Sequence, residues 1–484
     1  MRLEGRRKIF VENKEYDDLS ILEAWAYVSA IHKKNAFEIN YLHKYLKGKQ
    51  PILSRTKEVR PEICNKPVEN HALEIQNFKV GFTFGEPVQY VLHGDCKLHN
   101  SEKKNDTRVA SLNELMLADD KPSKDKRLGD WIMQSGVGYR MLLPTEKGSE
   151  FPFESYILDP RRTFVAISDD YKQEPVLCGY ISKNKSKVSI YSKTHFWEIE
   201  NGKITVSKLN NLGELPIIQY QNNANMQGCF ETVIDICDAL NNIQANRLDG
   251  VEQFIQSFIW FHNCDIDKEQ FEQLKANGGI KTKSPQGTQA QIKILSETLD
   301  QQQTQQLVDD LYQKMLTISG VPDRKASAGG NTGQALIIGE GWVMAESSAR
   351  DFELDFSKPE KAFLKLALKI CRNSSNCPSE IGDLSISDID IKFTRNKTDN
   401  ILTKTQALMN MLEAGVHPRV AFKICGLFND PEQAYQDSIP YLEKYVNGEG
   451  DGSELIDKAD NTDPVSEELL KVMTSIKNNI ENEE

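Results

Sequence analysis

The chain has 484 residues, of which 39% are apolar and 27% are charged, and its formal net charge is −12 at pH 7. One hydrophobic core rarely supports this length, so we expect two to four domains. The negative balance argues against a protein that binds nucleic acid through a basic face. It is compatible with a protein that lets DNA pass without adhering to it.

Nine cysteines are scattered along the chain and form no CxxC pair. This pattern indicates reduced thiols in the cytosol. Cys371 and Cys377 have no His or second Cys pair nearby, so we expect no metal site. The basic stretch Met1–Lys8 is not followed by the apolar region of a signal peptide, and apolar runs such as Phe254–Phe261 are too short for a bilayer span. We therefore expect no membrane contact.

The first predicted elements are helical. Asp17–Tyr45 carries apolar residues at helical spacing and predicts one or two helices, with Gly48 as a C-cap. Glu69–Phe78 predicts another helix, and Val80–Val91 predicts a strand bent by its glycines and proline.

A polar connection then leads into strands. It is expected to hold a short helix at Leu112–Leu117 and a loop at Asp119–Arg127. Trp131–Leu143 is expected to join a helix to a strand, and Asp159–Ile167 to open a meander with a hairpin turn at Asn201-Gly202. The later strands of this meander are Leu177–Ser182, Val188–Tyr191, Thr194–Glu200 and Lys203–Lys208.

The longest helical pattern covers Asn222–Trp260. A helix of about 30 residues spans roughly 45 Å and needs neighbours along its whole length. The pattern alone leaves two possibilities open: a central helix in a large α-rich monomer, or a helix packed into an assembly.

A small α/β insert follows the long helix. We expect a helix at Lys268–Asn277 and strands at Ile280–Lys283 and Ala290–Leu295. Helical periodicity resumes at Gln301. The apolar face of this second helix is expected to contain Leu307, Leu311, Met315 and Ile318. Two antiparallel helices would place the insert at the tip of a stalk.

The remaining chain is mostly helical. After Ser319–Pro322 we expect a glycine-rich loop that leads into a helix at Gln334, then a helix at Pro359–Cys371 and a strand at Ile386–Phe393. The last helices are expected at Asn400–Ala414, Pro418–Cys425 and Pro431–Val446, before the acidic, partly disordered tail Asn447–Glu484.

Two motifs suggest chemistry, but neither is complete. The stretch GGNTGQAL could bind a phosphate at a helix start, yet it lacks the Gly-Lys-Ser/Thr ending of a P-loop. Asp388 and Asp390, with Asp383 just before, could hold a metal, but there is no second acidic cluster at a supporting strand end, so we interpret them as a solvated strand face. We expect no catalytic residues, no metal and no cofactor, and hence no enzyme.

Five stretches, taken in order, resemble the portal proteins of tailed bacteriophages, in the form found in siphophages and prophages of Gram-positive hosts. They are YLKGKQPI, RPEICNKPVENHALEIQNFKVGFTFGEPVQY, IIQYQNNANMQGCFETVIDICDALNNIQANRLDGVEQF, SGVPDRKASAGGNTGQAL and FTRNKTDNILTKTQALMNMLEAGVHP. The likeness extends from about Tyr41 to Asp437.

This resemblance implies an α+β, mainly helical, multi-domain portal fold that assembles into a ring, usually a dodecamer. Its regions would be a wing, a stem of two helices, a clip, and a crown. By position these correspond to wing 1–221 and 321–398, stem 222–260 and 301–320, clip 261–300, crown 399–446 and tail 447–484.

The resemblance also implies site residues. A channel loop near 339–350 would face DNA through Gly339, Glu340, Gly341, Trp342, Glu346, Ser347, Ser348, Arg350 and Asp351. A clip surface facing the terminase would contain Lys268, Glu269, Gln273, Lys281, Lys283 and Gln286. The acidic balance suggests that carboxylates such as Glu252, Glu346 and Asp351 line the channel.

The implied partners are other copies of the chain, the terminase large subunit, a head-tail adaptor, the major capsid and scaffolding proteins, and double-stranded DNA that passes non-specifically. The implied location is the portal vertex of a capsid assembled in the bacterial cytoplasm. Three alternatives remain: another head-completion or minor capsid protein, a nucleotide-binding enzyme that uses GGNTGQAL, and a bacterial scaffold unrelated to phage.

Overall fold

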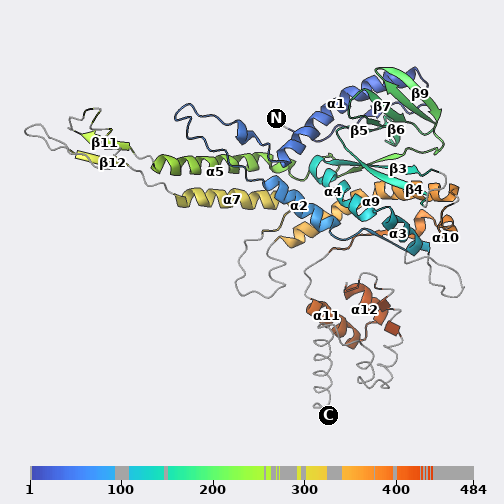
Figure 1. Ribbon diagram of the computed structural model, residues 1–484. Coiled ribbons are helices and arrows are strands. Elements are labelled where there is room, and N and C mark those ends of the chain that lie inside the picture. Colours follow the sequence, from blue (N-terminus) through green and yellow to red (C-terminus); the bar gives the residue numbers. More distant parts are fainter. Residues whose placement is uncertain are drawn as a thin grey trace, which may run out of the picture. The chain divides into compact units, whose positions relative to one another are not determined.

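The computed structural model describes residues 3–92, 108–146, 151–255, 258–262, 291–295, 301–323, 341–374, 376–395 and 401–425, with isolated residues between 267 and 272 and between 427 and 439. The chain divides into two compact units, Met1–Asn396 and Lys397–Glu484. Helices and strands are mixed throughout the first unit (Figure 1), so the predicted α+β class is confirmed.

The first long helix, α1 (Ser20–Leu46), follows the short strand β1 (Phe10–Val11). The Asp17 carboxylate accepts a hydrogen bond from the backbone N–H of Ser20 at 2.8 Å and stabilises the start of the helix. Gly48 has a φ of +80° and donates its N–H to the Tyr45 carbonyl oxygen at 3.0 Å. The predicted helix and its glycine cap are confirmed.

A six-stranded sheet packs beside α1 (Figure 1). The strands that follow β1 in it are β5 (Thr163–Ser168), β6 (Pro175–Ile181), β7 (Lys187–Tyr191), β8 (His195–Glu200) and β9 (Lys203–Leu209). Neighbouring strands are antiparallel except for β1 and β5. Asn201 and Gly202 both have positive φ, at 51° and 77°, as a two-residue hairpin turn requires. The predicted meander is confirmed.

A second sheet has the order β10-β3-β4. Its strands are β3 (Val137–Pro144), β4 (Phe153–Leu158) and β10 (Ile217–Gln221). Helix α4 (Lys121–Ser135) leads into β3 through Gly136, whose φ is +78°. The predicted loop at Asp119–Arg127 is therefore wrong. Its residues from Lys121 onward form the first turns of α4, because Pro122 suits a first turn and Lys121 and Asp125 are paired inside the protein.

The predicted strand at Val80–Val91 is also wrong in its first half. Helix α2 (His71–Phe84) continues to Phe84, and β2 covers only Gln89–Leu92. Ala72, Ile75, Val80 and Phe84 are all buried, so one helical face extends across the whole segment. The short 3-10 helix η1 (Pro51–Ser54) connects α1 to this region.

Strand β2 pairs antiparallel with β13 (Ile389–Lys392), and helices α3 (Arg108–Ala118) and α10 (Ser379–Gly382) lie nearby. The predicted strand at Ile386–Phe393 begins late, because Ile386–Asp388 forms a 3-10 turn, η3. The Asp388 carboxylate accepts the backbone N–H of Ser385 at 3.1 Å in a capping box. Asp388 and Asp390 therefore do not share a strand face as expected.

The long helix is shorter than the sequence predicts. The 3-10 turn η2 (Glu231–Val233) precedes α5 (Ile234–Ile255), and the chain then forms β11 (Phe258–His262). Residues Asn222–Gly228 fold into turns, because the Asn223 side chain accepts the N–H groups of Asn225 and Gln227, each at 3.1 Å.

The second half of the stalk returns along the first. Helix α7 (Gln301–Ser319) lies beside α5, and β12 (Gln291–Leu295) pairs antiparallel with β11 beyond their ends (Figure 1). The strand expected at Ala290–Leu295 is thus confirmed. The strand expected at Ile280–Lys283 and nearly all of the helix expected at Lys268–Asn277 lie outside the described residues.

Helix α9 (Trp342–Asn373) is continuous and contains Pro359, whereas the sequence predicts a separate helix from Pro359. Ala345, Ala349, Phe352 and Phe356 are buried at helical spacing before the proline, and this buried stripe explains the longer helix. The predicted glycine-rich loop and the helix at Gln334 lie outside the described residues.

The second unit contains α11 (Ile401–Glu413) and α12 (Pro418–Cys425). Gly415 has a φ of +78°, as expected for the residue that ends α11. Most of the helix predicted at Pro431–Val446, and all of the tail Asn447–Glu484, lie outside the described residues.

Candidate channel and assembly surfaces

Helices α5 and α7, here called the stem hairpin, bury one face against each other and against neighbouring parts of the first unit, to which they belong. Leu240, Val308 and Met315 are at most 9% exposed, and the Cys237 sulfur lies 3.7 Å from that of Met315. The predicted apolar face of α7 is only partly right: Leu307 and Ile318 are 49% and 56% exposed. The buried stripe instead contains Val308, Met315 and Leu316.

The loop that follows η1 is attached to the stem mainly through one carboxylate, with a further hydrogen bond from Arg55 to the Asn246 side chain at 2.6 Å. Asp249 of α5 is 3% exposed. It accepts the backbone N–H of Asn65 at 2.8 Å, the ammonium of Lys57 at 3.0 Å and the guanidinium of Arg55 at 2.9 Å. Burial alone would raise its pKa, but these donors hold the pKa at about 2. The stem is therefore fixed to this loop by a carboxylate that is ionised at neutral pH.

The solvent-facing side of the stem hairpin carries more acids than bases. Asp235, Glu252, Asp309 and Asp310 are exposed, and the exposed Lys314 is paired with Asp310 at 2.6 Å. Such a surface repels phosphate, so a nucleic acid close to it would be held weakly.

Aliphatic side chains are also exposed on the same hairpin. Leu248 and Val251 of α5 are each 47% exposed, and Leu307 and Ile318 of α7 are more exposed still. Single exposed aliphatic residues are ordinary, but four on one helical hairpin are typical of a surface that contacts another protein.

The predicted channel-loop residues do not all form a loop. Gly341 is the N-cap of α9, and Trp342 to Asp351 form its first turns, so the loop interpretation is wrong for these residues. Gly339 and Glu340 lie outside the described residues. Val343, Met344, Ser347, Arg350 and Asp351 are exposed along this part of the helix.

Three of the predicted residues are instead turned toward the protein. The Trp342 ring lies 5.9 Å from that of Phe78, and Ser348 accepts a hydrogen bond from Lys79 at 3.0 Å. Glu346 accepts hydrogen bonds from Arg395 at 2.6 Å and from Arg350 at 3.1 Å. Glu346 is therefore neutralised by two guanidinium groups, which leaves Asp351 as the open carboxylate of the predicted set on α9.

Of the predicted clip residues, only Glu269 is described, and it is an exposed helical residue. Lys268, Gln273, Lys281, Lys283 and Gln286 lie outside the described residues. This set therefore stays a prediction.

The described part of the chain shows no group of three or more His, Cys, Asp or Glu residues placed to hold a metal ion. Its cysteines, including Cys371 and Cys377, are free thiols. No helix among the described residues has both the length and the apolar character needed to cross a membrane. The stretch GGNTGQAL lies outside the described residues.

Comparison with known proteins identifies the family. The family model described as "Phage portal protein, SPP1 Gp6-like" matches residues 26–438. The chain belongs to this family. It is also similar to the portal protein of Bacillus phage SPP1, with 22% identity over 426 residues, which cover 81% of this chain and 78% of that protein.

The family confirms the resemblance found in the sequence, and it identifies the chain as a phage portal protein, a structural component of the virion. A role in the passage of DNA follows from this membership. The stem hairpin and the start of α9 are therefore the described surfaces to consider for DNA and for neighbouring subunits.

Sequence reasoning missed the most heavily bonded polar site, a buried cluster at the junction of α4, β3 and α9. Glu360 accepts hydrogen bonds from Tyr90 and Tyr220 at 2.6 and 2.7 Å. Lys121 and Arg140 pair with both Glu360 and Asp125. The only sequence signal is the spacing of Lys121 and Asp125, one helical turn apart, inside a stretch whose composition indicates a loop.

Proposed function

We propose that this portal protein assembles into a dodecameric ring around double-stranded DNA, with the stem hairpin repeated around the axis. The observation that carries the proposal is the composition of the hairpin surface, which combines exposed carboxylates with exposed aliphatic side chains. In a ring, the aliphatic residues would pack against the next subunit, and the acids would face the channel or solvent.

The regions of the chain follow from this arrangement. The wing would be residues 1–221 and 321–398, the stem 222–260 and 301–320, the clip 261–300 and the crown 399–446. The wing assignment is supported by the two sheets and by α9, and the stem assignment by α5 and α7. The paired strands β11 and β12 support a small clip at the end of the stem.

For the DNA channel, Asp351 and Glu252 are the stronger of the three proposed carboxylates. Both are exposed, whereas Glu346 is engaged by Arg350 and Arg395. DNA would then slide past a wall that attracts it little. A ring structure with a predominantly basic channel wall would contradict this assignment.

Negative-stain microscopy of the purified chain tests the assembly. Annular particles with a central hole are expected for the wild type. Replacing both Leu307 and Ile318 with Glu should reduce the annular fraction without lowering the melting temperature of the subunit. The matched control is Leu209→Glu on β9, because Leu209 is 69% exposed but lies outside the stem. Single compact particles of the wild type, or equal loss in the control, would refute the proposal.

The partners proposed for the two ends of the channel are the terminase large subunit and a head-tail adaptor, and capsid and scaffolding proteins would surround the wing. The clip residues Lys268, Glu269, Gln273, Lys281, Lys283 and Gln286 are proposed to face the terminase. Reversing the charge of Lys281 and Lys283 should weaken binding of the purified terminase large subunit to rings that still form. Unchanged binding would remove these residues from the contact, and no binding by wild-type rings would favour another head-completion protein.

A further inference from the structure

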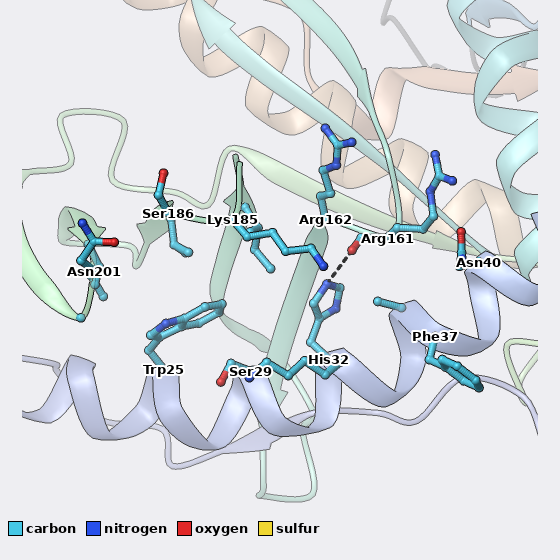
Figure 2. A pocket seen from close by; sticks show the side chains of 16 residues that line it. Trp25, Ser29, His32, Phe37, Asn40, Arg161, Arg162, Lys185, Ser186 and Asn201 are labelled. Carbon is cyan, nitrogen blue, oxygen red and sulfur yellow. Dashed lines mark hydrogen bonds between the residues drawn. The ribbon is translucent and has the colours of Figure 1, made fainter. Parts of the chain in front are cut away.

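A concave groove lies between α1 and the six-stranded sheet, with a volume of about 700 Å³. One wall is a single face of α1, where Trp25, Ser29, Lys33 and Phe37 follow one another at intervals of one turn. The opposite wall comes from the turn before β5 and from the two hairpin turns β6–β7 and β8–β9. Figure 2 shows the two walls, with Trp25, His32 and Phe37 on the helix and Arg162 and Lys185 on the sheet side.

The charge of this groove is opposite to that of the whole chain. Lys33, Arg161, Arg162 and Lys185 line it, and no Asp or Glu does. Arg161 is paired with Asp159 at 2.7 Å, but the other three cations make no ion pair with any carboxylate that the structure describes. Asp159 also attracts Arg162 electrostatically, so one carboxylate faces four cations. The excess positive charge concentrates positive potential in the concavity and favours an anionic ligand.

The groove also has an apolar side. From the sheet, the partly exposed Ile181 contributes, whereas Val188 and Ile199 are 5% and 2% exposed and belong to the core beneath. On the helix side, Phe37 is 64% exposed. An exposed phenylalanine beside a concave surface is a contact that a ligand with an apolar group can cover.

The groove is held in shape before any ligand binds. Trp25 packs on Phe164 with ring centroids 5.3 Å apart. His32 is 3% exposed, and its Nε2 lies 3.3 Å from the carbonyl oxygen of Arg161, which joins α1 to the turn before β5. Burial lowers the pKa of His32 to about 4, so this imidazole is neutral at pH 7 and the positive charge comes from the lysines and arginines.

We propose that this groove binds an acidic peptide segment of another protein, one that carries a large apolar side chain between carboxylates. The carboxylates would pair with Lys33, Arg162 and Lys185, and the apolar side chain would cover Phe37 and the partly exposed Ile181. Duplex DNA fits less well, because its phosphates lie on a convex cylinder that cannot reach into a groove between a helix and two turns. A small inorganic anion would leave Phe37 uncovered.

A peptide selection tests the chemistry without a named partner. A random dodecapeptide display library is selected against the purified full-length chain, and the enriched peptides are labelled and titrated by fluorescence anisotropy. We expect enrichment of peptides with several Asp or Glu around an aromatic or large aliphatic residue. Their affinity should fall with rising salt, because exposed ion pairs contribute to binding.

Three variants separate the groove from the rest of the surface. Lys33→Gln, Arg162→Gln and Lys185→Gln together should weaken the selected peptides by at least ~10-fold. Phe37→Ser should weaken them by several-fold while leaving the salt dependence in place. The matched control, Lys172→Gln, Lys203→Gln and Lys208→Gln, changes three other exposed lysines and should bind as the wild type does.

Two results would overturn the proposal. One is a selection that does not enrich acidic peptides, or that yields peptides whose affinity for the triple groove variant equals their affinity for the wild type. The comparison requires that the variant keeps the melting temperature of the wild type. The other is a labelled DNA duplex that binds the wild type, loses binding in the triple groove variant and displaces the selected peptides, since the groove would then be a phosphate site. Because the measurement uses peptides and the single chain, its failure leaves the ring proposal untouched.

Discussion

Glu360 offers the sharpest test of how the first unit is stabilised. It is fully buried, and its four interactions use both carboxylate oxygens: Tyr90 and Lys121 on Oε1, Tyr220 and Arg140 on Oε2. Together with Asp125, the cluster has two acids and two bases and is neutral overall. Glu360→Gln would keep the shape but leave one net positive charge buried.

Breaking a buried ion pair on one side costs about 3–5 kcal/mol, because the remaining charge has no compensation. We therefore expect Glu360→Gln to lower the free energy of unfolding of the first unit by about this amount. Adding Lys121→Met should recover part of the loss, since Arg140 and Asp125 would remain as a neutral pair. The double variant should be about 1–3 kcal/mol more stable than the sum of the two single effects predicts.

The pH dependence of stability gives a second, independent test of the role of Glu360. Burial alone would raise the pKa of Glu360, but Lys121, Arg140 and the two tyrosine hydroxyls lower it to about 2 from its usual 4.5. Its contribution to stability is then complete above about pH 4.5 and is lost as the pH falls toward 2. The difference between wild type and Glu360→Gln should shrink over this window.

Urea unfolding followed by tryptophan fluorescence measures both effects, with the slope of the transition checked for each variant. If Glu360→Gln lowers the free energy of unfolding by less than about 1 kcal/mol, the remaining positive charge is solvated by water or relieved by structural relaxation. That result would contradict the cost expected for an uncompensated buried charge. Strict additivity of the two substitutions would contradict the proposed charge balance.

Three other substitutions each test one further contact or turn of the first unit. Asp249→Asn should lower the free energy of unfolding by about 1–3 kcal/mol, because the Lys57 and Arg55 cations lose their carboxylate. It should also speed tryptic cleavage in the 55–66 loop, and unchanged cleavage would argue against this attachment. Burial raises the pKa of Glu231 to about 7, so the wild type should lose stability as the pH rises from about 4.5 to 7, and Glu231→Gln should flatten that loss in urea midpoints. Gly136→Ala should lower the free energy of unfolding by about 2 kcal/mol or more in the same urea assay, because φ is +78° and a Cβ would lie 2.1 Å from the Met226 carbonyl oxygen. An unchanged free energy of unfolding would mean that this turn relaxes freely.

The sequence predicted correctly the turns and strands that are determined by residues close together in the chain. Gly48, Asn201-Gly202 and Gly415 all adopt the positive φ that their positions suggest, and the meander follows its alternating residues. The sequence failed where the deciding interaction is distant. Lys121 and Asp125 look like a loop until Arg140 and Glu360 are placed beside them, 15 and more than 200 residues away.

The site was less predictable than the fold for the same reason. Periodicity put Leu307 and Ile318 on the inner face of α7, but the structure exposes both, because a narrower stripe suffices between two helices. The resemblance predicted a channel loop near 339–350, whereas Trp342 to Asp351 are helical. That these residues face a channel stays a prediction. The groove beside α1 left no sequence signal at all, because its cations come from separate elements.

The distribution of charge changes what the net charge of −12 means for a DNA channel. Residues 447–484 contain eleven Asp and Glu residues and three Lys, so most of the excess acid belongs to the tail. The remaining chain is nearly balanced, and its surfaces differ in sign: the stem hairpin exposes Asp235, Glu252 and Asp309, whereas the groove beside α1 exposes cations only. The acidic character of the stem is therefore a local property, and the whole-chain value is not evidence for it. In the proposed ring, charge reversal on the stem hairpin should consequently affect DNA passage, while removal of the tail should change the net charge without changing the charge of the hairpin surface.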